Sequence, residues 1–245
     1  LDKENIDDQI KISSNLERVL RYYQKIGLKW MKILDKYKFG GILADDMGLG
    51  KTIQILAVIE NYIENFNENL NIIKGQEEFI DTLNKKKPSL VVSPSSLCLN
   101  WKSEANKFTK NLKVLVINGN ANERKRKIQK INKYDLIITS YDSLKRDIDV
   151  YKERKYQFRF AITDEAQYLK NSNTQNAKAV KEIMADTKYA LTGTPIENSL
   201  AELWSIFDFI MPGYLFSYKK FKTEYETPII RENDSRAMKK LKMLI

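Results

Sequence analysis

Residues 43–54 read LADDMGLGKTIQ, and this stretch decides the expected fold. An apolar run leads into a turn with two glycines and a helix-like pattern follows, so the turn joins a strand to a helix. Glycine backbones curl readily, which lets several N–H groups point at one anion beside the positive end of the helix. Lys51 can reach the outer phosphates of a nucleotide, and the Thr52 hydroxyl can bind Mg²⁺. The strict pattern has glycine at Asp45, so a glycine-rich turn without a ligand is the alternative.

Short apolar runs alternate with helix-like stretches along the chain. The runs are residues 41–44, 90–93, 114–117, 136–139, 160–163 and 189–192. The helix-like stretches lie near residues 52–64, 97–108, 122–132, 142–148, 174–184 and 199–210. This alternation predicts an α/β fold with three α/β/α layers and a mainly parallel sheet. Such sheets bind ligands at the carboxyl ends of their strands, so the loops after the strands are where chemistry is expected.

The segments outside this rhythm differ in character. Residues 1–15 are polar and lack a period, whereas residues 16–37 have apolar positions three to four apart, which predicts one amphipathic helix. Residues 65–88 are rich in Asn, Glu and Lys and are interpreted as a surface insertion. Residues 214–245 are basic and aromatic, with no further strand. We therefore expect a lead-in at 1–15, one lobe at 16–230 and the start of a connecting segment at 231–245.

The composition narrows the possible chemistry. Of the 245 residues, 42% are hydrophobic, and no apolar run approaches the roughly 18–20 residues of a membrane-spanning helix, so no membrane partner is expected. The start of the chain lacks the features of a signal peptide. The single cysteine, Cys98, excludes an intrachain disulfide, and the absence of histidine excludes Ser-His-Asp, Cys-His and His-metal sites. The net charge of +10 favours polyanion partners, although a lysine-rich protein that binds nothing in particular is the alternative.

A second candidate stretch, FAITDEAQ, spans residues 160–167 and places two carboxylates at the end of a strand. Asp164 suits Mg²⁺, and Glu165 can polarise an attacking water. An Asp-Glu pair that only caps a helix is the alternative. Combined with Lys51 and Thr52 in a parallel-sheet pattern, the pair predicts hydrolysis of a nucleoside triphosphate.

A third stretch, LTGTPIEN, spans residues 191–198 and again lies beyond a strand. Small hydroxyl side chains at such a place can sense the γ-phosphate and pass its state to a neighbouring surface. An ordinary turn with a helix cap explains the same residues.

These stretches resemble, in order, the motifs of the Swi/Snf-type DNA translocases and remodelling ATPases of helicase superfamily two. Residues 45–52 resemble motif I, residues 164–167 resemble motif II in its DEAQ form, and residues 192–204 resemble motif III with the helix after it. Residues 20–30 are similar to the adenine-side Q motif, although Tyr22 stands where proline is usual. Residues 93–101 resemble motif Ia, residues 138–141 resemble motif Ib, and Lys170-Asn171 also match.

The resemblance implies roles for individual residues. It implies that the nucleotide is bound by Arg21, Gln24, Asp46, Met47, Gly48, Leu49, Gly50, Lys51 and Thr52, with Gln24 reading the adenine edge. It implies catalytic roles for Lys51, Asp164, Glu165 and Gln167, and Mg²⁺ ligation by Thr52 and Asp164. It implies that Thr192, Gly193 and Thr194 couple the nucleotide state to motion. DNA-backbone contacts are implied for Ser93, Pro94, Asn100, Trp101, Thr139, Ser140, Tyr141 and Asn171, although Trp101 suits a partly buried position and Asn100 suits a turn cap. The basic run 124–127 is expected to be a solvated helix face.

The function implied is that of a RecA-like lobe that uses ATP and Mg²⁺ to move on double-stranded DNA. Family members complete the site with arginines from a second RecA-like lobe of the same protein, so the lobe alone is expected to hydrolyse ATP poorly. Nucleoprotein complexes are further partners that the family implies. A strand-separating helicase, a restriction-type motor subunit and a non-catalytic nucleotide- or DNA-binding platform are the alternatives. The location expected is the cytoplasm, at a bacterial nucleoid, or the nucleus of a eukaryote.

Overall fold

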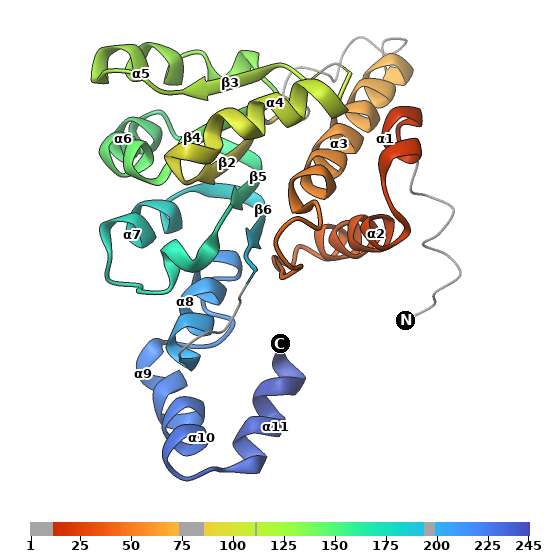
Figure 1. The fold of residues 1–245 in the computed structure, drawn as a ribbon. Helices are drawn as coiled ribbons and strands as arrows, with labels where there is room; N and C mark the ends of the chain where they lie inside the picture. The colour runs from red at the N-terminus through yellow and green to blue at the C-terminus, as the bar shows by residue number, and fades with distance from the viewer. Residues whose placement is uncertain (1–11, 74–85, 111, 194–198) are drawn as a thin grey trace.

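A six-stranded sheet forms the centre of the protein, and all of its strand pairs are parallel. The computed structural model describes residues 12–73, 86–110, 112–193 and 199–245. The strands are β1 (Gly41–Leu43), β2 (Ser89–Ser93), β3 (Val114–Ile117), β4 (Leu136–Ser140), β5 (Gln157–Thr163) and β6 (Met184–Leu191). Their order across the sheet is β1-β6-β5-β2-β4-β3 (Figure 1). All six predicted strands are confirmed, and β5 and β6 begin earlier than their fully apolar parts.

Helices cover both faces of the sheet. They are α1 (Ser14–Val19), α2 (Tyr22–Lys36), α3 (Lys51–Ile73), α4 (Cys98–Phe108), α5 (Ala121–Ile128), α6 (Tyr141–Glu153), α7 (Gln175–Lys181) and α8 (Leu200–Ile210). Alternate side chains of β2 enter different cores, because successive residues of a strand point to opposite faces. Leu90 and Val92 pack with α6, α7 and α8, whereas Val91 packs with α2, α3 and α4. Figure 1 shows α6 and α7 on one side of the sheet and α2 and α3 on the other, which confirms the three layers.

The predicted single helix over residues 16–37 is two helices. The chain is extended at Leu20 and Arg21, between the end of α1 and the start of α2. The side chain of Gln24 accepts a hydrogen bond from the Arg21 N–H at 2.9 Å, which caps a new helix start at this point. Apolar residues recur every three to four positions on both sides of this break, so their spacing could not reveal it. The lead-in is also shorter than expected: α1 begins at Ser14, and the Ser13 hydroxyl donates to Glu60 at 2.7 Å.

The prediction of an insertion over residues 65–88 is partly wrong, because helix α3 includes residues 65–73. Residues 74–85 lie outside the described residues, as do residues 1–11 of the lead-in. The rest of the segment leads directly into β2.

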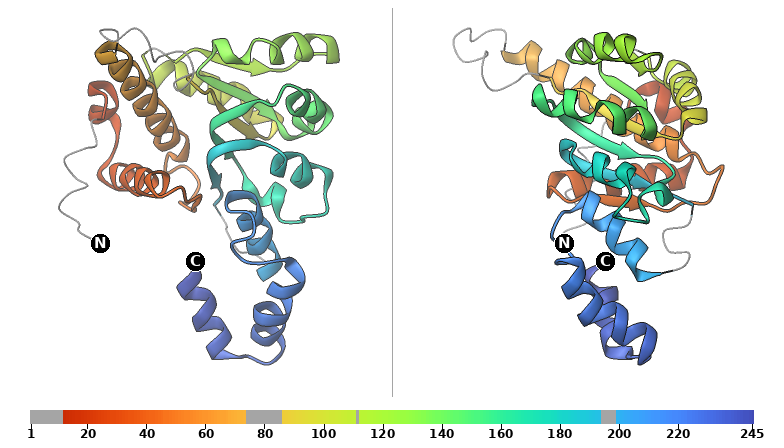
Figure 2. Two further views of the ribbon diagram at one scale, coloured as in Figure 1. Left: turned by 180° about the vertical axis from the view of Figure 1, so that it is seen from behind. Right: turned by 90° about the vertical axis from the view of Figure 1, so that its left-hand side faces the viewer.

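The end of the chain is helical: α8 confirms the helix-like stretch predicted at 199–210, and the segment after it contains no strand, as predicted. It contains α9 (Tyr218–Phe221), the π-helical turn η6 (Lys222–Glu226), α10 (Thr227–Arg231) and α11 (Ser235–Leu244). Figure 2 shows these helices, in blue, projecting beyond the sheet. Aromatic side chains hold the first of them to α8, since Trp204 and Tyr218 pack with ring centroids 5.1 Å apart. None of the helices in the described ranges combines the length and apolar character that crossing a bilayer requires.

Candidate nucleotide and metal site

The loop between β1 and α3 has the shape of a phosphate-binding turn. Gly48 and Gly50 both have positive φ, at 82° and 75°, which side chains with a Cβ adopt only at a cost. The Lys51 ammonium folds over this turn and donates to the main-chain carbonyls of Asp45 at 2.6 Å and Asp46 at 3.2 Å. The positive charge therefore lies at the mouth of the turn, beside the start of α3.

Gln24 supports the turn from the adjacent helix α2. Its Nε2 donates to the Leu49 carbonyl at 2.9 Å, and the same carbonyl accepts from the Tyr23 hydroxyl at 3.0 Å. A Cβ at Gly50 would lie 2.5 Å from Gln24 Nε2, so glycine is required for this close approach as well as for its φ. Gln24 is buried and Arg21 is exposed. The bonds of Gln24 show how the Q-motif stretch contacts the turn, and its contact with adenine stays a prediction.

Asp45, the departure from the strict glycine pattern, has a structural role. Its Oδ2 accepts a hydrogen bond from Nε2 of Gln54 on α3 at 2.8 Å. This bond links the start of the turn to the first full turn of the helix. Gly27 on α2 makes room for the same glutamine, because a Cβ there would lie 2.0 Å from Gln54 Oε1.

The acid pair Asp164-Glu165 follows β5, two strands away from β1 in the sheet. The main chain of Asp164 continues the ladder by donating to Val92 at 2.8 Å. Glu165 then adopts the left-handed region, with φ 53° and ψ 59°. A left-handed residue that is not glycine costs on the order of 1–3 kcal/mol, and such residues concentrate at functional sites. Gln167, predicted as a catalytic residue, donates to Glu165 Oε2 at 2.7 Å.

The phosphate turn and the acid pair line one cavity of about 260 Å³. Its lining residues are Met47, Gly48, Gly50, Lys51, Thr52, Leu97, Asn100, Trp101, Glu104, Asp164 and Glu165. Burial raises the pKa of Asp164, and a hydrogen bond from Trp101 and the nearby Lys51 charge oppose that rise. The predicted phosphate turn and acid pair therefore lie around one cavity, and their roles in binding and catalysis stay predictions. Asp46 and Leu49 contribute main-chain carbonyls behind the turn, and their side chains do not line the cavity.

The oxygen donors in this cavity fit Mg²⁺. Thr52 and Asp164 offer a hydroxyl and a carboxylate, which are hard ligands for a hard cation. In the described ranges, no group of three or more Asp, Glu or Cys side chains could hold an ion alone. Mg²⁺ is commonly held by one or two carboxylates together with substrate phosphates, and Thr52 and Asp164 are oxygen donors of the kind it binds.

Two residues for which the sequence predicts contacts with DNA instead form hydrogen bonds with Asp164. Trp101 on α4 donates its indole N–H to Asp164 Oδ2 at 2.8 Å. Tyr141, at the start of α6, donates its hydroxyl to the Asp164 main-chain carbonyl at 2.8 Å and stacks on Tyr168. Glu104, which also lines the cavity, was missed. Glu104 lies one helical turn after Trp101 on an amphipathic helix, and this spacing could have indicated that both side chains face the same cavity.

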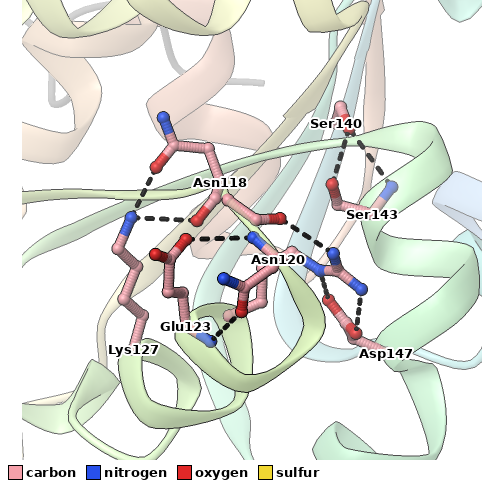
Figure 3. Close-up of polar contacts among 9 residues, drawn as sticks. Asn118, Asn120, Glu123, Lys127, Ser140, Ser143 and Asp147 are labelled. Carbon is pink, nitrogen blue, oxygen red and sulfur yellow. Dashed lines mark hydrogen bonds and ion pairs between the residues drawn. The ribbon is translucent and has the colours of Figure 1, made fainter.

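Of the other six predicted DNA contacts, three also have buried side chains. The side chains of Ser93, Thr139 and Ser140 are buried, as are those of Trp101 and Tyr141, so none of them offers an exposed side chain to DNA in this conformation. The reason is their position at the ends of β2 and β4 or under α4, where the chain is covered by helices. Contact of these residues with DNA stays a prediction. Ser140 caps α6 by accepting from the Ser143 N–H at 3.2 Å (Figure 3). Pro94 is partly exposed, and Asn100 and Asn171 are exposed, so only these three keep a surface for DNA.

The stretch after β6 reaches the phosphate turn from another side. Thr192 is buried, and its N–H donates to the Leu43 carbonyl of β1 at 3.2 Å. A Cβ at Gly193 would lie 3.4 Å from Met47 Cγ, so this glycine borders the turn. Thr194, the third predicted coupling residue, lies outside the described residues.

The basic run at 124–127 is largely engaged within the protein. Arg124 forms a buried ion pair with Asp147, and Lys127 donates to the main-chain and side-chain oxygens of Asn118 (Figure 3). Lys125 and Arg126 are exposed. The expectation of a solvated face holds for these two residues and fails for Arg124.

Comparisons with known proteins agree with this geometry. The chain is 39% identical, with a TM-score of 0.75, to the Sulfolobus solfataricus SWI2/SNF2 ATPase core solved in complex with double-stranded DNA, covering 96% of this chain and 43% of that one. It is 37% identical over 94% of its length to TATA-binding protein-associated factor MOT1 of Saccharomyces cerevisiae, and spans 12% of that protein. It is 38% identical over 94% of its length to an ATP-dependent helicase of Mycoplasma genitalium, and spans 20% of it.

A parallel sheet with a glycine turn and an acid pair meeting at one cavity defines a RecA-like P-loop ATPase lobe. Many kinds of motor protein contain such a lobe, and comparison of the sequence shows to which family this chain belongs. The chain belongs to the SNF2-related domain family, whose profile matches residues 23–245. It is therefore an ATPase domain of the SNF2 family.

Proposed function

We propose that this domain is the ATP-binding lobe of a motor that moves along double-stranded DNA and remodels protein–DNA complexes. The observation that carries the proposal is the meeting of Lys51 with Asp164 and Glu165 in one cavity of an SNF2-family lobe. The related Sulfolobus core was solved with double-stranded DNA, which supports duplex DNA as the partner. The net charge of +10 supports a polyanion partner of the same kind. Such a partner agrees with a location at a bacterial nucleoid or in a nucleus.

In the proposed reaction, the Lys51 ammonium exchanges its main-chain carbonyl partners for the outer phosphates of ATP. Thr52 and Asp164 hold Mg²⁺, which would neutralise charge that develops on the phosphates. Glu165 orients and polarises the attacking water, and Gln167 fixes the Glu165 carboxylate through the bond between them. Gln24 and Arg21 bind on the adenine side. The main chain of Gly193, beside Met47, carries the state of the phosphate turn toward the segment that follows β6.

A second RecA-like lobe is part of the proposal. The chain spans 43% of the Sulfolobus core, so that related chain contains about as much sequence again. Arginines from a second lobe would add charge at the γ-phosphate, which accelerates phosphoryl transfer by orders of magnitude. We expect the 245-residue chain to bind ATP weakly and to hydrolyse it poorly.

The test uses the full-length protein and its ATPase rate with and without duplex DNA. We expect duplex DNA to stimulate hydrolysis, and Lys51→Ala to abolish it. Lys125→Ala is the matched control, because this lysine is exposed and far along the chain from the cavity. If Lys51→Ala keeps DNA-stimulated hydrolysis, the phosphate-turn assignment is wrong.

Two further assays separate the alternatives. A translocase displaces a third strand from a triplex without separating the duplex, whereas a strand-separating helicase releases single strands from a forked duplex. Strand release in step with hydrolysis would replace the translocase proposal with the helicase alternative. A protein that binds nucleotide and DNA without turnover would be a binding platform.

A further inference from the structure

The indole of Trp101 fixes one oxygen of the Asp164 carboxylate. Trp101 Nε1 donates to Asp164 Oδ2 at 2.8 Å, and the side chain is only 2% exposed. The other oxygen, Oδ1, accepts the main-chain N–H of Glu165 at 3.0 Å. Because each oxygen has its own donor, rotation of the carboxylate would break both hydrogen bonds. The orientation of this carboxylate is therefore set by the protein before any ligand binds.

We propose that Trp101 is a positioning residue, which holds the Asp164 carboxylate in the orientation that binds the Mg²⁺ of a bound nucleotide. The inference rests on the proposed nucleotide site and adds the residue that orients its metal ligand. Groups that hydrogen-bond a metal-ligating carboxylate fix its direction, and their loss typically lowers metal affinity about 10–100-fold. Trp101 acts through Asp164, and its own indole offers no metal ligand.

Helix α4 also reaches the second proposed Mg²⁺ ligand. Glu104 lies three residues after Trp101, on the same face of α4, and lines the same cavity as Thr52. Burial, together with the negative charge of Asp164, raises the pKa of Glu104, and a hydrogen bond with the Thr52 side chain opposes that rise. One face of α4 thus contacts both Thr52, at the start of α3, and Asp164, just after β5.

The main chain of Asp164 is held independently. The Tyr141 hydroxyl donates to the Asp164 carbonyl at 2.8 Å from the opposite layer of helices. Loss of the indole N–H should therefore leave Oδ2 without its donor, so that only the Glu165 N–H still orients the carboxylate, while the backbone stays in place. Because the side chain and the main chain of Asp164 are held by different residues, a substitution of Trp101 can weaken Mg²⁺ binding without moving the backbone.

Trp101 is also part of the core beneath α4, so a control for lost packing is needed. Trp204 on α8 provides it. This side chain is 9% exposed, and its indole donates to the Phe216 carbonyl at 3.2 Å, outside the cavity that holds Lys51 and Asp164. Trp204→Phe removes the same atoms and the same kind of hydrogen bond without touching Asp164.

The experiment titrates Mg²⁺ against the 245-residue chain with a fluorescent ADP analogue and compares Trp101→Phe with Trp204→Phe. For Trp101→Phe, we expect the Mg²⁺ concentration at half-maximal binding to rise roughly tenfold. Binding of the analogue in EDTA should be unchanged, and high Mg²⁺ should restore full binding. Trp204→Phe should shift neither value. An unchanged Mg²⁺ midpoint in Trp101→Phe, or an equal loss of binding with and without Mg²⁺, would show that Trp101 only packs.

A second measurement needs no change at Trp101. The chain has three tryptophans, so Trp30→Phe with Trp204→Phe leaves Trp101 as the only indole. Adding Mg²⁺ to the ADP-saturated double variant should shift the Trp101 emission, and an unchanged spectrum would overturn the inference. Failure of the proposed nucleotide site looks different: Lys51→Ala would then bind the analogue as well as the unmodified chain does, with or without Mg²⁺.

Discussion

Gln24 donates a hydrogen bond from Nε2 to the main-chain carbonyl of Leu49, at 2.9 Å, and so joins helix α2 to the phosphate turn. The same side chain accepts the Arg21 N–H through Oε1 and begins α2. One buried amide therefore ends the extended link after α1 and supports the loop that follows β1. The nucleotide site depends on the position of α2 through this residue.

Replacement of this amide should weaken nucleotide binding without unfolding the protein. Gln24→Ala removes one of the two donors to the Leu49 carbonyl, and loss of a hydrogen bond of this kind typically costs about 0.5–1.5 kcal/mol. We expect about a tenfold loss of affinity for a fluorescent ADP analogue, measured by titration. Tyr22→Ala is the control, because that side chain is 81% exposed. Equal affinities for Gln24→Ala and the control would show that the turn keeps its shape without Gln24.

The two glycines of the turn should differ in their tolerance of a methyl group. Both have positive φ, so alanine at either position costs on the order of 1–2 kcal/mol in backbone strain. At Gly50 the new Cβ would also lie 2.5 Å from Gln24 Nε2, whereas at Gly48 nothing lies within 4 Å. Gly50→Ala should therefore lower the urea midpoint of the ligand-free chain more than Gly48→Ala. The reverse order, or equal midpoints, would contradict the close approach of Gln24.

Lys188 should make stability rise with pH on the alkaline side. Burial lowers the pKa of this β6 lysine from 10.5 to about 8, although Asp208 opposes the change. Between pH 8 and pH 10 the folded chain loses the proton while the unfolded chain keeps it. Because the unfolded state then binds more protons, the free energy of unfolding increases with pH in this window.

Lys188→Met tests this directly, since methionine keeps the length of the side chain without its charge. The variant should be more stable than the unmodified chain at pH 7, and the difference should shrink as the pH approaches 9.5. Urea unfolding at several pH values measures both effects. A difference in the free energy of unfolding that stays constant across this pH range would mean that burial does not lower the pKa of Lys188.

The sequence predicted the sheet and the cavity because both depend on local patterns. Apolar runs mark buried parallel strands, and the residues after β1 and β5 must meet at one edge of such a sheet. The roles of Trp101 and Tyr141 could not be predicted in this way. Their hydrogen bonds to Asp164 cross 63 and 23 positions of sequence, and a motif shows only which residues recur together. The break before α2 was missed for the same reason, since it depends on what Gln24 contacts.

Of the four residues of the basic run at 124–127, Arg124 joins two helices, whereas Lys125 and Arg126 are exposed. Arg124 donates to both carboxylate oxygens of Asp147, at 2.6 and 2.9 Å, and to the Gly119 carbonyl at 3.0 Å. This pair joins α5 to α6, while Lys125 and Arg126 point to solvent. Charge alone would treat the three residues alike.

Arg124→Ala should therefore destabilise the chain by about 3–5 kcal/mol, because it leaves the Asp147 carboxylate buried and unpaired. Lys125→Ala and Arg126→Ala should stay within about 0.5 kcal/mol of the unmodified chain. Removal of both charges, in Arg124→Leu with Asp147→Leu, should recover most of the loss, since no unpaired charge then remains. Urea unfolding of the four variants measures this order. If Arg124→Ala is as mild as Lys125→Ala, the ion pair does not stabilise the junction of α5 and α6.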